Sequence, residues 1–190
     1  MGVPFKRRRR GGIEVRLPQD ERAVLARLLD DVGTLLDDDL PPDAPPRDPL
    51  ADLVGMDPGR PVVRPQDPAV ARLLPDGNTD DPEAAEEFRR LTEHGLRLRK
   101  RSNLALAVEA LQRGDDPVVL APAEANALLK GLTDVRLVLA ERLGLHSDED
   151  AATLHDAVRA AGDTDEPWIV HAALYDVLTW WQEALVDALT

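Results

Sequence analysis

The densest group of reactive side chains in this sequence is a run of five consecutive cations: Lys6, Arg7, Arg8, Arg9 and Arg10. Guanidinium groups donate paired hydrogen bonds to phosphate oxygens, so such a run can bind a nucleic-acid backbone. Residues 1–10 contribute a charge of +5 and the whole chain carries −13, so residues 11–190 carry −18. We predict salt-sensitive, nonspecific DNA contact through this run, because phosphates carry no sequence information. A solubilising tail, or an arm that folds onto the acidic surface of the chain, are the alternatives.

A second basic stretch contains Arg89, Arg90, Arg97, Arg99, Lys100 and Arg101. Glu86 precedes Arg90 by four residues and Glu93 precedes Arg97 by four, which is the favourable orientation for ion pairs within a helix. We therefore interpret most of this stretch as a salt-bridged helix face exposed to solvent. The three cations at its end have no such acid and are predicted to form a patch that binds a partner: Arg99, Lys100 and Arg101.

Groups that could catalyse a reaction or bind a metal lack the necessary spacing. The four histidines match no metal-binding motif, and no phosphate-binding loop, dinucleotide fingerprint or nucleophile elbow occurs. The chain has no cysteine, which excludes disulfides, thiolate metal sites and thiol catalysis within it. We predict no catalytic residue, no cofactor and no metal. An enzyme that uses histidine and carboxylates is the least supported hypothesis.

A helix-turn-helix is suggested by the expected helices 124–143 and 147–160, which flank a short turn. In a DNA-reading unit the start of the second helix faces bases and phosphates. Here that start is Asp148-Glu149-Asp150, which repels phosphate. We therefore interpret this pair as a helical hairpin of the core.

Two tryptophans lie side by side near the end of the chain. Trp181 shares a helical stripe with apolar residues, whereas Trp180 lies about 100° away around the helix. Trp180 is accordingly a candidate anchor for a protein partner. The alternative is a second core tryptophan in a chain that contains only 3% aromatic residues.

Apolar spacing and proline positions predict a mainly α fold, a helical bundle with one small β element. Ile13–Leu17 alternates apolar and polar residues, and we expect it to pair with Val118–Leu120 as a two-stranded sheet. Asp81-Pro82 and Ser147 with Asp150 are typical helix starts. The expected helices cover residues 18–36, 82–112, 122–143, 147–160 and the chain from residue 167, with short turns at 50–56 and 69–74.

Domain organisation follows from the same patterns. We predict a disordered basic arm over residues 1–11 and a single helical domain over 12–190. A connection rich in proline and aspartate, at about 37–82, interrupts the domain because no long helix tolerates such a density of proline. No apolar run approaches the roughly 18 residues of a membrane span, and no signal-peptide core follows the cations. We therefore predict a cytoplasmic protein.

Several segments together resemble an actinobacterial family that has been catalogued as a domain of unknown function. They are the strand at Gly12–Leu17, the proline-rich middle, the arginine-rich helix at 89–104, residues 119–143, and the terminal stretch at 175–183. Genes of this family tend to neighbour the gene for the protease adaptor ClpS. Its members are labelled as the oxidative-stress transcriptional regulator AosR.

The resemblance implies a non-enzymatic regulator of transcription that binds a sigma factor or RNA polymerase. One feature of the chain departs from a redox regulator, because sensing through thiols needs cysteine and this chain has none. An adaptor or interaction module linked to ClpS-dependent proteolysis is the alternative function. In either case the predicted contact residues are Lys6–Arg10, Arg99, Lys100, Arg101 and Trp180.

Overall fold

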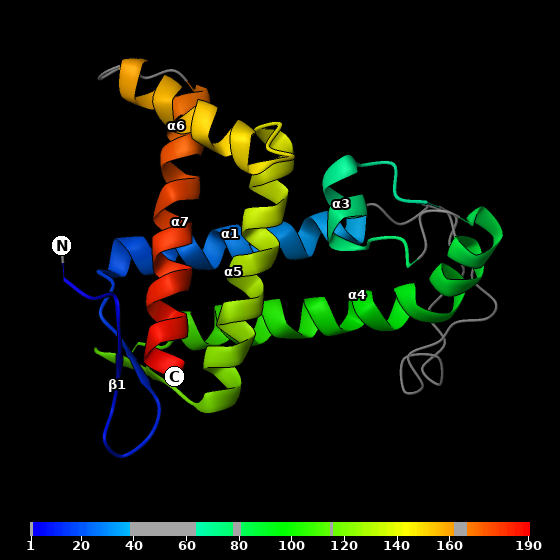
Figure 1. Cartoon of the computed structure of the whole chain (residues 1–190). Coiled ribbons are helices and arrows are strands. Elements are labelled where there is room, and N and C mark those ends of the chain that lie inside the picture. The colour runs from blue at the N-terminus through cyan, green and yellow to red at the C-terminus, as the bar shows by residue number, and fades with distance from the viewer. Residues whose placement is uncertain (1, 39–63, 78–80, 115, 162–166) are drawn as a thin grey trace.

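The computed structural model describes residues 2–38, 64–77, 81–114, 116–161 and 167–190 (Figure 1). In this part of the chain six helices accompany one three-stranded antiparallel sheet, which confirms a mainly helical fold. The helical turn predicted at 50–56 and most of the proline-rich connection at 37–82 lie outside the described residues. Within the described ranges, no helix has both the length and the apolar character needed to cross a membrane.

The helices begin and end close to the residues that their sequence signals predict. Asp81 caps one of them, since its carboxylate accepts hydrogen bonds from the backbone nitrogens of Glu83 and Ala84. Ser147 and Asp150 exchange side-chain and backbone hydrogen bonds as predicted. The bounds are α1 Gln19–Asp38, α3 Pro68–Leu73, α4 Pro82–Gln112, α5 Pro122–Arg142, α6 Asp148–Ala161 and α7 Pro167–Leu189.

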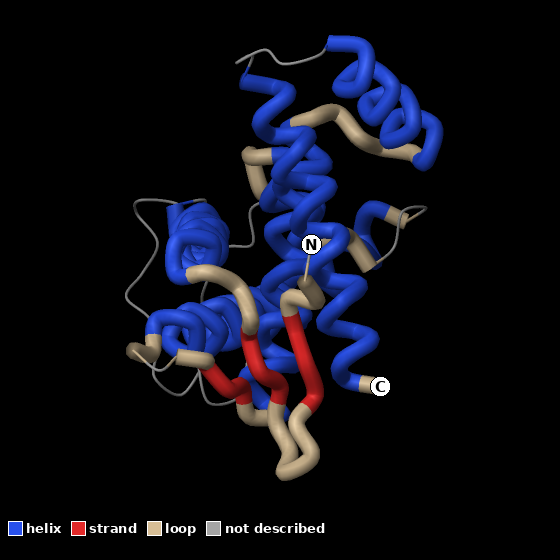
Figure 2. Tube along the Cα trace, turned by 90° about the vertical axis from the view of Figure 1, so that its left-hand side faces the viewer, coloured by secondary structure: helices blue, strands red, loops and turns tan. Residues whose placement is uncertain are grey.

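The sheet has three strands where the sequence predicts two. β2 (Ile13–Val15) pairs with β3 (Val118–Leu120), as expected, and Ile13 lies opposite Leu120. The additional strand, β1 (Phe5–Arg7), pairs with the other side of β2, with Phe5 opposite Val15. Figure 2 shows the three strands side by side, with the loop between β1 and β2 projecting beyond the helices.

The prediction of a disordered arm over residues 1–11 is therefore wrong for the segment that contains β1. Charge repulsion within the run predicts a mobile segment, but Phe5 is only 1% exposed and joins the core. The backbone nitrogen of Arg16 also donates to the carbonyl oxygen of Pro4, which extends the ladder beyond the strand. Burial of one aromatic ring and the backbone hydrogen bonds of the sheet hold the segment in place.

Helix α5 lies at the centre of the packing and contacts α1, α3, α4, α7 and β3. Figure 1 shows α5 and α7 side by side and crossing α1 and α4. Leucine and alanine fill most of the core, in keeping with the scarcity of aromatic residues. Gly131 of α5 lies where Leu29 of α1 reaches the helix, and an added Cβ would stand 2.5 Å from Leu29 Cδ2. Glycine at this position therefore allows the close approach of α1 to α5.

Replacing Gly131 with alanine is expected to lower the free energy of unfolding by about 1–2 kcal/mol. Leu29 is fully buried, and its side chain must shift to admit the added methyl group. We expect the cost of this overpacking to exceed the gain in helix propensity, which is at most about 1 kcal/mol. Urea denaturation measures the change.

Gly33→Ala is the matched control, because a Cβ at Gly33 of α1 would meet nothing within 4 Å. That variant is expected to gain about 0.5–1 kcal/mol from helix propensity. A Gly131→Ala protein as stable as the wild type would contradict the role given to the contact with Leu29.

Candidate functional site

The first candidate site is the basic hairpin, which we define as β1, the turn at residues 8–12 and β2. Gly11 and Gly12 have φ angles of 87° and 82°, which residues that carry a Cβ atom rarely adopt. The backbone nitrogen of Arg8 donates to Gly12 O at 3.0 Å, and that of Gly11 donates to Arg8 O at 3.1 Å. A Cβ on Gly12 would lie 2.8 Å from Leu120 O, so the turn also depends on glycine for its approach to β3.

The five cations of this hairpin are all exposed, but they differ in their contacts. Arg7 donates a 2.9 Å hydrogen bond to the main-chain oxygen of Thr190, which links β1 to the end of α7. Arg8 lies 3.8 Å from the carboxylate of Glu14. Arg9 and Arg10, at the turn, form no ion pair with any described residue. The hairpin therefore presents guanidinium groups to solvent in a defined backbone geometry.

Glu14 is the acidic residue inside this hairpin, on β2. A hydrogen bond from Arg16 lowers the pKa of Glu14, and the charges of Arg16, Arg8 and Lys6 lower it further. Glu14 therefore stays ionised at neutral pH and compensates one of the nearby cations. The remaining positive charge is concentrated at the turn.

The predicted patch of Arg99, Lys100 and Arg101 on α4 does not form, because the three side chains meet different surroundings. Lys100 binds Asp134 of α5 at 2.5 Å. Burial raises the pKa of Asp134 by more than the hydrogen bond and charge of Lys100 lower it, so this pKa lies above its usual value. Arg101 binds Asp37 of α1 at 2.7 Å. Arg99 is left exposed by itself. Two of the three cations therefore connect helices instead of presenting a surface.

The earlier part of the same stretch is largely paired, as the acidic spacing predicts, but the prediction that this face is exposed to solvent is wrong for Arg97, which is only 6% exposed. Arg97 binds Glu93 at 2.9 Å, and it also donates to the carbonyl oxygen of Leu36 near the end of α1. Arg90 pairs with Glu87, three residues away, and not with the predicted Glu86. Arg89, whose pairing was not predicted, contacts Glu93 and Asp76.

Trp180 is half-buried and lines a groove of about 560 Å³ between β1 and α7. Trp181 is 3% exposed and lies in the core, as its place on the apolar stripe predicts. The groove also has charged walls, with Lys6 and Arg7 on one side and Glu183 and Asp187 on the other. Trp180 is thus accessible beside the basic hairpin, and its role as a partner anchor stays a prediction.

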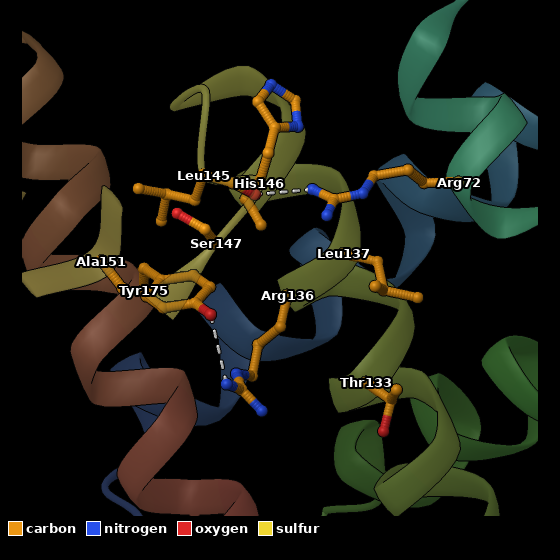
Figure 3. A pocket seen from close by; sticks show the side chains of 10 residues that line it. Arg72, Thr133, Arg136, Leu137, Leu145, His146, Ser147, Ala151 and Tyr175 are labelled. Atoms are coloured by element: carbon orange, nitrogen blue, oxygen red, sulfur yellow. Dashed lines mark hydrogen bonds between the residues drawn. The ribbon is translucent and has the colours of Figure 1, made fainter. Parts of the chain in front are cut away.

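The second candidate site is a pocket of about 250 Å³ where α3, α5, α7 and the α5–α6 connection meet. Figure 3 shows its walls, with Arg72 reaching across from α3 and Arg136 extending from α5 towards Tyr175 of α7. Arg72 donates to Leu145 O at 2.9 Å. Polar side chains converge here with an apolar floor, an arrangement common in small-molecule sites. The remaining lining residues are Thr133, Leu137, Ala140, His146, Ser147 and Ala151.

Chemically, this pocket is better suited to binding than to nucleophilic attack. Ser147 Oγ accepts a 3.2 Å hydrogen bond from the backbone of Asp150 and so serves as a helix cap. His146 Nδ1 lies 3.7 Å from Glu141, and the side chain is largely exposed. Covalent catalysis needs a nucleophile within hydrogen-bonding distance of a base. Among the described residues of this pocket, no such pair is present.

The other histidines add nothing to this pocket. His94 is half-buried on α4 and His171 is exposed on α7, while the side chain of His155 lies outside the described set. Among the described residues, no three histidine, aspartate or glutamate side chains gather closely enough to hold a metal ion.

Sequence reasoning identified the cations of the hairpin but missed Arg72, Arg136 and Tyr175. One signal was present, because Arg136 interrupts an otherwise apolar run from Val135 to Ala140. A charge inside such a run is either paired or functional. Arg72 and Tyr175 had no comparable signal, since only the docking of α3 and α7 on α5 brings them to the pocket.

A family model described as "Domain of unknown function (DUF2017)" matches residues 3–189. Comparisons with curated proteins and with solved structures give no match. Because the family match covers nearly the whole chain, the basic hairpin and the pocket both lie within the family domain.

Asp67 is expected to hold α3, and hence Arg72, against α5. Its carboxylate accepts a 2.8 Å hydrogen bond from the backbone of Ala69 and lies 2.5 Å from Arg142. Asp67→Ala should lower the free energy of unfolding by about 1 kcal/mol through loss of the helix cap alone. Asp67→Asn keeps a capping oxygen and removes only the charge, so it should be the milder change in urea denaturation.

The charge contribution of Asp67 should also depend on pH. The hydrogen bond from Arg142 is the main cause that lowers the pKa of Asp67 in the folded protein. The ion pair therefore stabilises the fold fully at a pH above the pKa of Asp67 in the unfolded chain, which is about 3.9. This stabilisation disappears as the pH falls through the lower pKa that Asp67 has in the folded protein. We expect the wild type and Asp67→Asn to differ in stability at pH ~7 and to converge below pH ~4. A difference that stays constant over this range would be inconsistent with the ion pair.

Proposed function

This chain belongs to the DUF2017 family, and we propose that it is a non-enzymatic, cytoplasmic regulator of transcription of the AosR type. In this proposal it works by binding, with the basic hairpin contacting DNA phosphates and the acidic helical body contacting a protein of the transcription machinery. A sigma factor or RNA polymerase is the partner that the resemblance to AosR implies.

The observation that carries the DNA contact is the basic hairpin itself. Its turn presents Arg9 and Arg10 without ion-pair partners among the described residues, and Phe5 anchors the strand that leads to them. A segment that is already ordered loses less conformational entropy on binding than a disordered arm would. Guanidinium groups presented in this way suit phosphate oxygens, and the contact would be nonspecific.

The charge of the body supports a protein partner in addition to DNA. Residues 11–190 carry −18, so the body as a whole repels a polyanion, and among the described residues the hairpin is where exposed positive charge is concentrated. An acidic surface favours association with a basic one. Specificity for a promoter would then come from the protein partner, and the hairpin would add affinity for DNA in its neighbourhood.

Replacing Arg8, Arg9 and Arg10 with serine should abolish binding to a fluorescein-labelled DNA duplex in an anisotropy titration at low salt. The wild type should bind with a Kd that weakens steeply with salt, because binding releases counterions. Each lost phosphate contact should reduce the slope of log K against log salt by about 1.

A matched control changes the net charge by the same amount at exposed cations away from the hairpin: Arg27→Ser, Arg99→Ser and Lys130→Ser together. This variant should bind DNA nearly as well as the wild type. If both triple variants lose binding equally, net charge and not the hairpin governs the interaction. If the wild type does not bind DNA at low salt, the DNA contact is absent.

The protein contact is tested by co-purification with the tagged full chain from its native cell. We expect a sigma factor or subunits of RNA polymerase to be retained in amounts comparable with the bait. Recovery of ClpS or protease subunits in their place would contradict the regulatory function and support the adaptor alternative.

A further inference from the structure

Arg136 is half-buried, and its two hydrogen-bond partners among the described residues are both neutral. It donates to Gln182 Oε1 at 2.8 Å and to the hydroxyl of Tyr175 at 3.3 Å. Its guanidinium carbon also lies 5.1 Å from the centre of the Tyr175 ring. Its Nε is buried and has no hydrogen-bond partner. A half-buried guanidinium with only neutral hydrogen-bond partners lacks the counterion that a buried charge normally has.

Three other buried or half-buried arginines in the described part of the chain face carboxylates. Arg89 and Arg97 both bind Glu93, and Arg113 binds Glu124 at 2.8 Å. The chain has 36 acidic residues against 23 basic ones, so a carboxylate partner is the common outcome. Arg136 departs from this pattern although it lies in the core-facing helix α5, where an uncompensated charge costs most.

The space next to Arg136 is the pocket shown in Figure 3. On its opposite wall, the charge of Arg72 is already balanced, because Arg72 lies 3.4 Å from Glu141 and donates to Leu145 O. Leu137 and Ala140 supply apolar surface between these two arginines, and Thr133 adds a hydroxyl. The uncompensated positive charge of the pocket is therefore that of Arg136.

We propose that this pocket binds a small molecule that carries an oxyanion, either a carboxylate or a phosphate, with Arg136 as its counterion. Apart from the buried Nε–H, two of the five guanidinium N–H donors of Arg136 are not used by Gln182 and Tyr175, and these two can donate to the oxyanion. A volume of about 250 Å³ admits a small metabolite, and its apolar part would lie against Leu137 and Ala140. This site is separate from the basic hairpin and does not depend on the proposed DNA contact.

The test uses the full chain labelled with ¹⁵N and follows the Nε–Hε resonance of Arg136 by NMR. Sodium phosphate and sodium succinate are titrated separately at neutral pH, with sodium chloride holding the ionic strength constant. We expect a saturable shift of this resonance with at least one of the two anions. A response to phosphate alone assigns the phosphate class, and a response to succinate alone assigns the carboxylate class.

Thermal unfolding gives a second measure with matched variants. The anion that binds should raise the Tm of the wild type by about 3–5 °C at ten times its Kd. Arg136→Gln should lose this rise, whereas Lys130→Gln, which removes an exposed cation from the same helix, should keep it. If Arg136→Gln does not fold, the NMR titration of the wild type decides by itself.

Two outcomes would overturn the site. One is the absence of a saturable shift at Arg136 with either anion up to ~50 mM, which corresponds to affinities too weak for a specific site. The other is an equal rise of Tm in the wild type and in Arg136→Gln, since the anion would then act elsewhere on the protein. Because neither readout involves DNA, failure here leaves the proposed function unchanged, and failure of the DNA assay leaves this site unchanged.

Discussion

The close packing of α5 against α1 is the constraint on which the rest of the molecule depends. Gly131 lets the side chain of Leu29 approach the backbone of α5. Helix α5 in turn contacts α3, α4, α7 and β3 as well as α1. Interiors are packed like solids, so a helix at such a junction transmits its position to its neighbours. The pocket beside Arg136 exists because α3 and α7 both dock on this helix.

Cations serve two physical roles in this acidic chain. Within the helical body, Arg97, Lys100 and Arg101 bind carboxylates or a carbonyl oxygen and thereby connect α4 to α1 and α5. On the hairpin, Arg9 and Arg10 have no such partner among the described residues and face solvent. Exposed cations elsewhere on the described surface, such as Arg27, Arg99 and Lys130, are not consecutive in the chain. Among the described residues, the densest group of cations available to a polyanion is therefore at the hairpin.

The two candidate sites are built in different ways. The hairpin is local, since Gly11, Gly12 and a few backbone hydrogen bonds define its turn, and Phe5 holds it to the core. The pocket is assembled from residues far apart in the chain, with Arg72, Arg136 and Tyr175 on three different helices. A mutation in the hairpin therefore acts on one site, whereas a change in the packing of α5 alters the pocket as a whole.

Patterns within the sequence determined the helices and their ends, because caps, prolines and apolar periodicity act between residues that are near neighbours. The helix starts at Asp81, Pro122 and Ser147 and the location of strands β2 and β3 follow from such signals. Only the tertiary structure decided that Phe5 orders the basic run and that Lys100 and Arg101 find partners on other helices. It alone brought Arg136 to Tyr175 and Arg72. These outcomes depend on long-range burial and ion pairing, which one-dimensional spacing does not encode.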